Sequence, residues 1–281
     1  MKEQFTERSN PYIGISGVIS GQQKYLMSQF AQADINTLPG DRRIAFGVKT
    51  THKTQFLDQI NKYGSEWYPV GEEEFSNALE DNASSEVRVA QVYLEPEFVG
   101  DPDYRKAFID RICQRGKAWL NAIQFDMLPW HSDDSLLPFL EQVKDETGHT
   151  ILLQAHSEAM QHLGPNGIAK KLGQYAHALD YILFDASHGK GVRMNASALK
   201  PFLEAGYNSH ELSRVGFSVA GGLNADAVRE DLPLLLEDYP DISWDAEGQL
   251  HPVQKNGTRP VDGKLAFQYV EASVEVLKMY N

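Results

Sequence analysis

Ionisable and polar side chains stand at the ends of most of the short apolar segments in this chain. These side chains are Ser16, Lys49, Glu95, Asp126, His156, Asp185, Asp245 and Glu247. Carboxylates and imidazoles can exchange protons near neutral pH when their surroundings adjust their pKa values, which favours general acid/base chemistry. Carboxylates are costly to bury without partners, so a group of them indicates a hydrated, ligand-binding opening.

A glycine pair forms the most specific motif, in the segment FSVAGGLNADAV at 217–228. Gly221 and Gly222 follow an apolar segment, and Asn224 stands where the N-cap of a helix belongs. Glycines allow a ligand to approach the backbone closely, and free N–H groups at a helix start attract anions. The segment therefore predicts an anion-binding turn, although a capped helix after a glycine turn would have the same sequence.

The elements that must position these residues alternate along the chain. Short runs rich in β-branched and aromatic residues have the length and composition of strands buried on both faces. They occupy 13–19, 43–50, 87–95, 122–127, 150–157, 181–187, 214–221 and 241–248. Helix-like stretches lie between or after them at 23–33, 103–116, 135–147, 223–239 and 263–279.

This alternation predicts a single α/β domain over residues 1–281, folded as a (β/α)8 TIM barrel. The competing open, doubly wound sheet usually carries GxGxxG after its first strand, and GVISGQQ lacks that pattern. Longer insertions are expected at 63–86 and 249–261. Active sites of such barrels lie at the carboxyl ends of the strands, where the ionisable residues stand.

Composition narrows the choice of partners. The formal charge is −13 over 281 residues, which disfavours nucleic acid and anionic membrane surfaces as partners. A small-molecule substrate is expected instead, and the oligomeric state is left open. A lone Cys113 excludes a disulfide within the chain and fits a cytoplasmic protein. The amino-terminal residues lack the apolar core of a secretory signal, and no apolar run approaches the roughly 18 residues that cross a bilayer.

The chain resembles phosphoribosylanthranilate isomerase in four segments that occur in the same order. AGGLNADAV (220–228) is similar to that family's phosphate-binding turn, and LFDASHGKGVRMN (183–195) to its sixth strand and the glycine-rich loop that follows. AIQFD (122–126) resembles the fourth strand, with Gln124 after two apolar residues, and IGISGV (13–18) resembles the first.

The resemblance implies an Amadori-type isomerisation of a sugar phosphate derivative, without metal or organic cofactor. It assigns the acid to Asp185 and the base to a first-strand cysteine, a position that Ser16 occupies here. An unassisted serine is too weak a base for this step. The family's fourth-strand histidine is Asp126 in this chain. The ligand-binding positions that the resemblance implies are Gln124, Gly189, Lys190, Gly191, Gly221, Gly222 and Asn224.

The eighth strand also departs from the family pattern. Asp245 and Glu247 stand where small residues would complete the phosphate cradle, and carboxylates repel a dianion. Lys190 and Arg193 could offset that charge. The acids therefore point away from the ligand, or the ligand carries no phosphate monoester.

Three hypotheses remain open at this point. The first is an isomerase acting on a sugar or sugar-phosphate derivative, in which Asp126, His156 or Lys49 replaces the missing base; Lys49 could instead hold a substrate carboxylate. The second is a metal-assisted hydrolase or aldolase-like enzyme, with the acids and His156 around a divalent ion. The third is a barrel that binds a small molecule without turnover.

Several aromatic residues could stack on a sugar or aromatic ring. They are Trp67, Tyr68, Trp130 and Trp244. Trp130 and Trp244 are the stronger candidates, because each lies close to a strand end.

Overall fold

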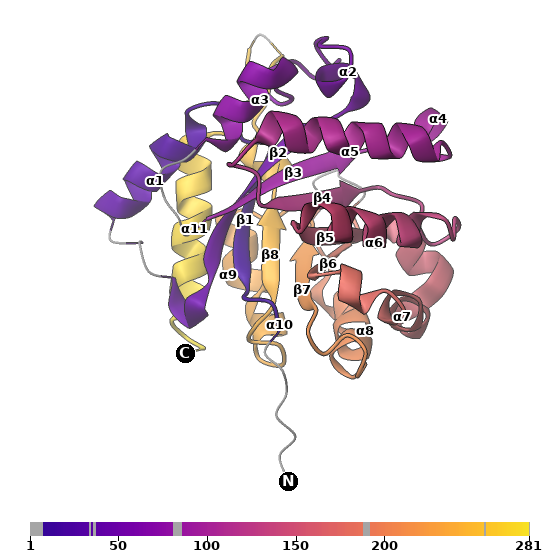
Figure 1. The fold of residues 1–281 in the computed structure, drawn as a ribbon. Coiled ribbons are helices and arrows are strands. Elements are labelled where there is room, and N and C mark those ends of the chain that lie inside the picture. The colour runs from indigo at the N-terminus through magenta and orange to yellow at the C-terminus, as the bar shows by residue number, and fades with distance from the viewer. Residues whose placement is uncertain are drawn as a thin grey trace.

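The computed structural model describes residues 8–33, 35, 38–80, 86–187, 192–255 and 257–280. Within them, eight parallel strands close into a barrel in sequence order, β8 pairing with β1 (Figure 1). The strands are β1 (Tyr12–Ser16), β2 (Arg43–Thr50), β3 (Val87–Tyr93), β4 (Ala122–Asp126), β5 (Thr150–His156), β6 (Tyr181–Asp185), β7 (Gly216–Ala220) and β8 (Ser243–Ala246). The predicted (β/α)8 barrel is confirmed, and each predicted strand is present: β2 has its predicted bounds, and the other strands have one or both ends shifted by one to three residues.

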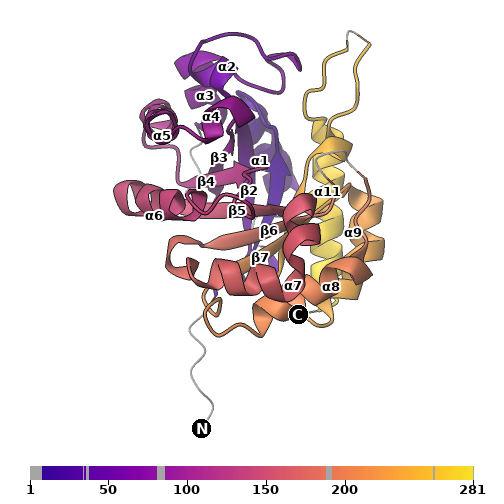
Figure 2. The same cartoon turned by 90° about the vertical axis from the view of Figure 1, so that its right-hand side faces the viewer.

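Helices surround the barrel (Figures 1 and 2). The longer ones are α1 (Gln22–Gln32), α3 (Gly71–Leu79), α5 (Pro102–Gly116), α6 (Leu136–Thr147), α7 (Ser157–Gly173), α8 (Ala196–Tyr207), α9 (Ala225–Asp231) and α11 (Gly263–Leu277). Three short ones are α2 (His52–Gln55), α4 (Pro96–Val99) and α10 (Pro233–Leu236). Three 3₁₀ turns occupy Pro39–Asp41, Ala176–Ala178 and Gly248–Leu250.

Two of the sequence predictions need correction. The stretch 223–239 is not one helix, because Pro233 cannot donate a backbone hydrogen bond within a helix; α9 ends at Asp231 and α10 begins at the proline. The expected insertion at 63–86 contains α3, the outer helix that follows β2. Three glutamates in the first turn of α3 made this helix look like a charged loop in the sequence.

Alternation along the strands separates two apolar regions. One set of strand side chains packs outward against the helices and includes Ile13, Phe46 and Phe184. The other set forms a smaller cluster of Tyr12, Ala45, Val87, Val89, Ala122, Leu152 and Tyr181. Most members of this second cluster lie near the amino ends of their strands, so it forms the floor of the barrel interior. The polar strand-end side chains lie above that floor.

Two long connections rise at the same end of the barrel. The segment 51–70 between β2 and α3 and the loop 247–262 between β8 and α11 both extend at the top of Figure 2. They meet where the ring of Trp67 stacks on that of His251, with ring centroids 5.1 Å apart. Nε2 of His251 lies 2.8 Å from the backbone oxygen of Ser16. Both connections are thereby tied to the carboxyl end of β1.

Gly14 provides the space that a buried acid of β8 occupies. A Cβ atom at position 14 would lie 1.7 Å from Oδ1 of Asp245. We expect Gly14→Ala to lower the free energy of unfolding by about 1–3 kcal/mol or more, as overpacking of a core does. Asp245→Ala should recover most of that loss, because it removes the clashing oxygen. Denaturant unfolding of the two single variants and the double variant measures this coupling.

Gly100→Ala is the matched control, since a Cβ atom there meets nothing within 4 Å and the φ angle is −78°. Equal losses from Gly14→Ala in the presence and absence of Asp245 would contradict the proposed packing.

Candidate functional site

Three carboxylates and one ammonium share the carboxyl end of the barrel. Asp126 ends β4, Asp185 ends β6, Glu247 follows β8, and Lys49 lies near the end of β2. Nζ of Lys49 pairs with Oε1 of Glu247. The charges of Lys49, Glu247 and Asp185 all act on the carboxyl group of Asp126. The structure therefore brings together four residues that the sequence had singled out.

Asp126 has a pKa close to neutral pH. Burial raises its pKa to about 7; the hydrogen bond from Gln124 and the charge of Lys49 lower the pKa, and the charges of Glu247 and Asp185 raise it. Nε2 of Gln124 donates to Oδ1 over 2.8 Å. Gln124 therefore orients Asp126. Asp126 is half-buried, so a ligand at the rim can reach it.

Asp185 is held firmly as a hydrogen-bond acceptor. Nε2 of Gln154 donates to Oδ2 over 3.0 Å, and the backbone and hydroxyl of Ser187 donate to Oδ1 over 2.7 and 2.6 Å. Gln154 also accepts from the backbone of Met127 over 2.8 Å, which links β5 to the loop after β4. The side chain of Asp185 is 5% exposed. Its carboxylate is therefore fixed in orientation and suited to accept hydrogen bonds.

Lys49 is a permanent cation. Burial lowers the pKa of its ammonium, but Glu247, Tyr68 and Asp126 together raise it by more, and the net shift is upward. The ammonium lies 4.7 Å from the ring centroid of Trp67 and 5.3 Å from that of Tyr68. Of the three candidate bases, Lys49 is therefore the least able to accept a proton at neutral pH.

Asp245 lies deeper in the barrel interior than the rim acids. The hydroxyl of Tyr12, a residue of the barrel floor, donates to Oδ2 over 2.6 Å, and Oγ of Ser218 lies 3.5 Å from the same oxygen. Burial raises the pKa of Asp245 to about 6; the bonds from Tyr12 and Ser218 lower it, and the charges of Glu247 and Asp185 raise it. Asp245 is thus directed toward Tyr12, while Glu247 is directed toward Lys49.

Packing accounts for the glycine turn after β7. Gly221 and Gly222 have φ angles of 135° and 55°, which favour glycine. Oδ1 of Asn224 caps α9 by accepting from the backbone of Ala227 over 2.9 Å. A Cβ atom at Gly221 would lie 3.1 Å from that of Met194 in the preceding loop. The turn keeps the geometry that was expected for it, and its use by an anion stays a prediction.

Arg193, one of the two cations expected to offset the charge near a phosphate, has acidic partners on α9. The guanidinium of Arg193 pairs with Asp231 and Glu230 of α9, at 2.7 and 2.6 Å. Gly189, Lys190 and Gly191 lie outside the described residues.

Ser16 has a partner that cannot activate it. Its hydroxyl accepts from Nε2 of Gln91 over 2.8 Å, and the side chain is 3% exposed. An amide takes no proton at neutral pH, so this contact gives the serine no base. The glutamines Gln91, Gln124 and Gln154 thus form a layer beneath the rim, on three adjacent strands.

Two other strand-end residues turn toward neighbouring loops. Nε2 of the buried His156 lies 3.2 Å from the backbone oxygen of Leu128, and its ring contacts His131 with centroids 5.2 Å apart. Glu95 accepts from the backbone N–H of His52 over 3.1 Å, at the start of α2. His156 therefore stays a candidate of lower rank than Asp126, and Glu95 has a structural partner.

The structure corrects the choice of aromatic residues. Trp130 and Trp244 are both 0% exposed. Their indole N–H groups donate to the backbone oxygen of Gln154 over 3.0 Å and to Oγ of Ser273 over 3.1 Å. Trp67 and Tyr68, which the sequence favoured less, lie beside Lys49 instead.

Sequence reasoning missed Tyr12, Gln91 and Gln154, and it named Tyr68 only as a possible stacking residue. The two glutamines and Tyr12 could have been found by counting alternate residues back from each strand end. Tyr68 comes from a connection whose path the sequence does not reveal.

The described residues contain no group of three or more His, Cys, Asp or Glu side chains placed to hold a metal ion. In the same part of the chain, no helix is both long and apolar enough to cross a membrane. The metal-assisted hypothesis therefore lacks a compact ligand set among these residues.

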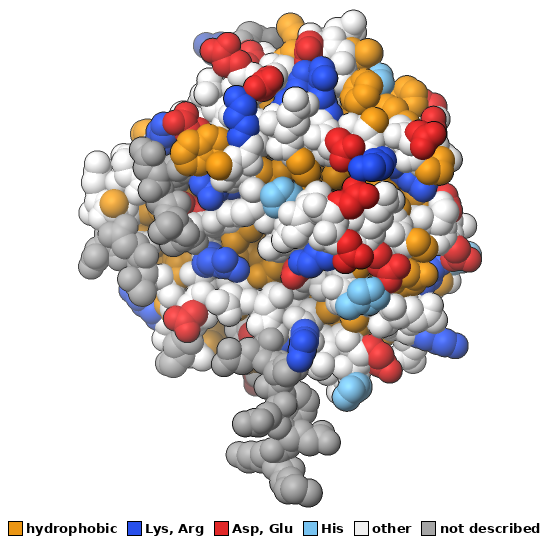
Figure 3. All heavy atoms as spheres, viewed as in Figure 1, with side chains coloured by type: hydrophobic (Ala, Val, Ile, Leu, Met, Phe, Trp, Pro, Cys, Tyr) orange, Lys and Arg blue, Asp and Glu red, His pale blue; other side chains and the backbone are white. Residues whose placement is uncertain are grey.

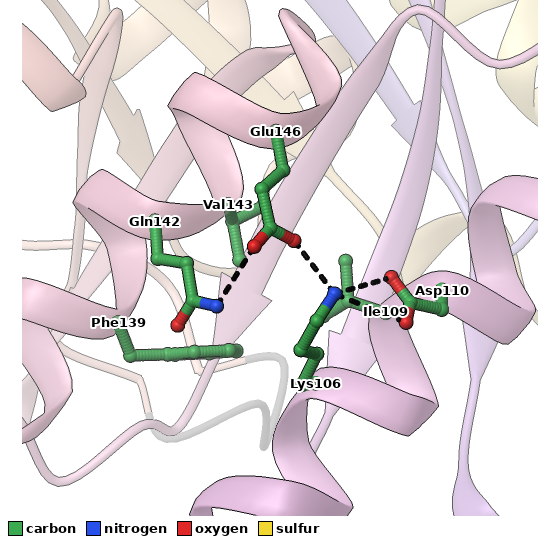
Figure 4. Close-up of a pocket in the computed structure, with 7 residues that line it drawn as sticks. All are labelled: Lys106, Ile109, Asp110, Phe139, Gln142, Val143 and Glu146. Carbon is green, nitrogen blue, oxygen red and sulfur yellow. Dashed lines mark hydrogen bonds and ion pairs between the residues drawn. The ribbon is translucent and has the colours of Figure 1, made fainter.

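A shallow hollow on the outer surface is another possible binding site. It lies between α5 and α6, where Lys106 binds Asp110 and Glu146 over 3.2 and 2.8 Å and Gln142 donates to Glu146 over 2.9 Å (Figure 4). Basic and acidic side chains also lie side by side on the face drawn in Figure 3. These polar groups bind one another, so the hollow is a weaker candidate than the rim of the barrel.

Comparison with solved structures supports the fold. A monomeric form of the dimeric phosphoribosylanthranilate isomerase from Thermotoga maritima superposes with a TM-score of 0.52 and 13% identity, over 94% of this chain and 98% of the other. The likeness is one of fold. Neither the protein-family models nor the curated proteins give a match to this chain.

Asp245 should make the stability of the protein depend on pH. Its folded-state pKa of about 6 exceeds the value of about 3.9 for an unperturbed Asp, so the folded state keeps a proton that the unfolded chain releases. Its contribution is therefore fully present below about pH 4 and is lost as pH rises through about 6. We subtract the unfolding free energy of the natural chain from that of Asp245→Asn at each pH. This difference should increase by about 2–3 kcal/mol from pH 4 to pH 7.5.

Urea unfolding at the two pH values measures this difference. Asp238→Asn, which alters an exposed acid paired with Lys200, should show almost none of it. An Asp245→Asn effect that is the same at both pH values would refute the assignment.

Proposed function

We propose that this chain is an isomerase of a sugar or sugar-derived small molecule, acting by general acid/base catalysis at the carboxyl end of the barrel. The observation that carries the proposal is Asp126, a half-buried acid whose pKa is raised to about 7 and which Gln124 orients. A group with a pKa near the working pH can both remove and return a proton. Such a group is what an aldose–ketose or Amadori rearrangement needs at the carbon next to the carbonyl.

Asp126 is the general base in this proposal, because Ser16 is unsuited to that role. The two residues lie at the carboxyl ends of β4 and β1, around the same rim. Asp126 can accept a proton from carbon in its ionised form, whereas the hydroxyl of Ser16 is bound to an amide. The resemblance to phosphoribosylanthranilate isomerase suggests the reaction class, and this substitution suggests a different base within it.

Asp185 is better suited to orient the substrate than to supply a proton. Among the described residues, Gln154 and Ser187 donate the hydrogen bonds that fix its carboxylate. Its remaining lone pairs can accept hydrogen bonds from substrate hydroxyl groups. We therefore assign it the role of holding the sugar, in place of the acid role that the resemblance gives it.

Proton exchange from solvent tests the role of Asp126. Five- and six-carbon aldoses and ketoses and their aminodeoxy derivatives, with and without a phosphate, are incubated with the protein in D2O and followed by proton NMR. We expect deuterium at the carbon next to the carbonyl of at least one of them. Asp126→Asn should slow this exchange by about 100-fold or more, in line with the usual contribution of a general base.

The pH profile of the exchange gives a second measurement. Because the base must be ionised, the rate should rise with pH through about 7, and this limb should vanish in Asp126→Asn. Asp134→Asn, a change in an acid whose side chain is 93% exposed, should leave both rate and profile unchanged. Exchange that persists undiminished in Asp126→Asn would rule out this base, and a whole panel without exchange would rule out the isomerase proposal.

A further inference from the structure

The connection between β2 and α3 brings an aromatic pair to the rim. Trp67 and Tyr68 come from this segment rather than from a strand. The Lys49 ammonium lies over both rings, at 4.7 and 5.3 Å from their centroids. Trp67 is 8% exposed, and Tyr68 is partly buried. These two rings therefore form a wall beside the Lys49–Glu247 ion pair.

Lys49 cannot accept the hydroxyl proton of Tyr68. The ammonium of Lys49 has three N–H donors and no acceptor; one donor reaches Glu247, and the ring centroid of Tyr68 lies 5.3 Å from the same nitrogen. In any hydrogen bond between the two residues the phenol oxygen would be the acceptor. The O–H of Tyr68 is then available to another acceptor, and the charges of Glu247 and Asp126 are felt at the same phenol.

Tyr68 keeps this proton at physiological pH. Burial raises the pKa of the phenol, the charge of Lys49 lowers it, and the charge of Glu247 raises it, with a net upward shift. The side chain is therefore a neutral donor that lies beside a cation. A donor polarised in this way, fixed in a site of low polarity, stabilises negative charge that develops on a nearby oxygen.

We propose that Tyr68 is a catalytic residue and that, with Lys49, it forms an oxyanion site for the enediolate of an aldose–ketose rearrangement. This inference rests on the proposed function, because it assumes that Asp126 removes a proton from carbon. Asp126 takes the proton from C2, the C–H electron pair forms the C1=C2 double bond, and the carbonyl π pair moves onto O1. The O–H of Tyr68 and the ammonium of Lys49 bind that oxygen.

The remaining steps need no further reactant. The hydroxyl proton on O2 moves to O1, Asp126 returns its proton to C1, and the carbonyl is left at C2. The ligand class that fits the site is a planar, anionic enediolate or a mimic of one. Neither the strand-end pattern nor the family resemblance assigns a role to Tyr68.

A buried N–H group of Trp67, beside Tyr68, supports the binding of a ligand that carries a hydrogen-bond acceptor. Nε1 of Trp67 is buried and has no acceptor among the described residues. A Cβ atom at Gly17, just after β1, would lie 2.6 Å from this nitrogen. Buried N–H groups without an acceptor are uncommon and costly. The edge formed by Lys49, Trp67 and Tyr68 thus has more hydrogen-bond donors than the described chain has acceptors for them.

Binding of an enediolate mimic tests the oxyanion site directly. The probe is D-erythronohydroxamate, and D-erythronamide serves as the comparison because it lacks the second, ionisable oxygen. Calorimetric titration of the full chain should show that Tyr68→Phe weakens hydroxamate binding by about tenfold or more, as expected for a lost hydrogen bond to a charged group. Its effect on amide binding should be much smaller.

Tyr63→Phe is the matched control. Tyr63 lies in the same segment, stacks on Tyr68 with ring centroids 6.0 Å apart and is 47% exposed. Removing its hydroxyl should leave the affinity for both ligands unchanged. The ratio of hydroxamate to amide affinity within each variant separates loss of the donor from a general loss of folded protein.

The outcomes distinguish this inference from the proposed function. Equal hydroxamate affinities in the natural chain, Tyr68→Phe and Tyr63→Phe would overturn the oxyanion site. The absence of any hydroxamate binding would do the same. Neither result would contradict a deuterium exchange that depends on Asp126. Weaker hydroxamate binding in Tyr68→Phe alone would support the site. If that result came without deuterium exchange in any sugar, the oxyanion site would stand and the isomerase proposal would fall.

Discussion

Closure of the strand ladder between β8 and β1 is the constraint on which the rest of this molecule depends. It places the carboxyl ends of all eight strands around one rim, so residues far apart in the chain become neighbours. Lys49 and Glu247 are separated by 198 positions and still form an ion pair. The same closure requires that interior side chains fit one another. Gly14 on β1 therefore leaves room for Asp245 on β8.

The electrostatic character of the rim follows from what lies beneath it. The floor of the barrel is apolar apart from the hydroxyls of Tyr12 and Tyr181, and above it a layer of glutamines supplies amide groups rather than charges. Gln124 and Gln154 donate to the acids Asp126 and Asp185. Amides can orient a carboxylate without neutralising it, so Gln124 leaves Asp126 able to exchange a proton. Burial and mutual repulsion then raise the pKa values of Asp126 and Asp245.

Much of this arrangement could be predicted from the sequence, because strand-end residues of a parallel barrel share one rim. That rule found Lys49, Asp126, Asp185 and Glu247. Period-two alternation, applied strictly, would also have corrected Trp244: it adjoins Asp245 in β8, and since Asp245 faces the interior, Trp244 must face the helices. Tyr68 could not have been predicted in this way, since the path of the connection 51–70 depends on tertiary contacts such as the stack of Trp67 on His251.

The position of Trp67 gives the protein a built-in optical reporter. Trp130 and Trp244 are fully enclosed and hydrogen-bonded, so their fluorescence depends on the integrity of the core. The indole of Trp67 has the charges of Lys49 and Arg259 over its ring, at 4.7 and 4.9 Å. A ligand that binds Lys49 changes the electric field across this indole and, with it, its emission wavelength. Occupancy of the rim can therefore be read from the natural chain without a dye or a label.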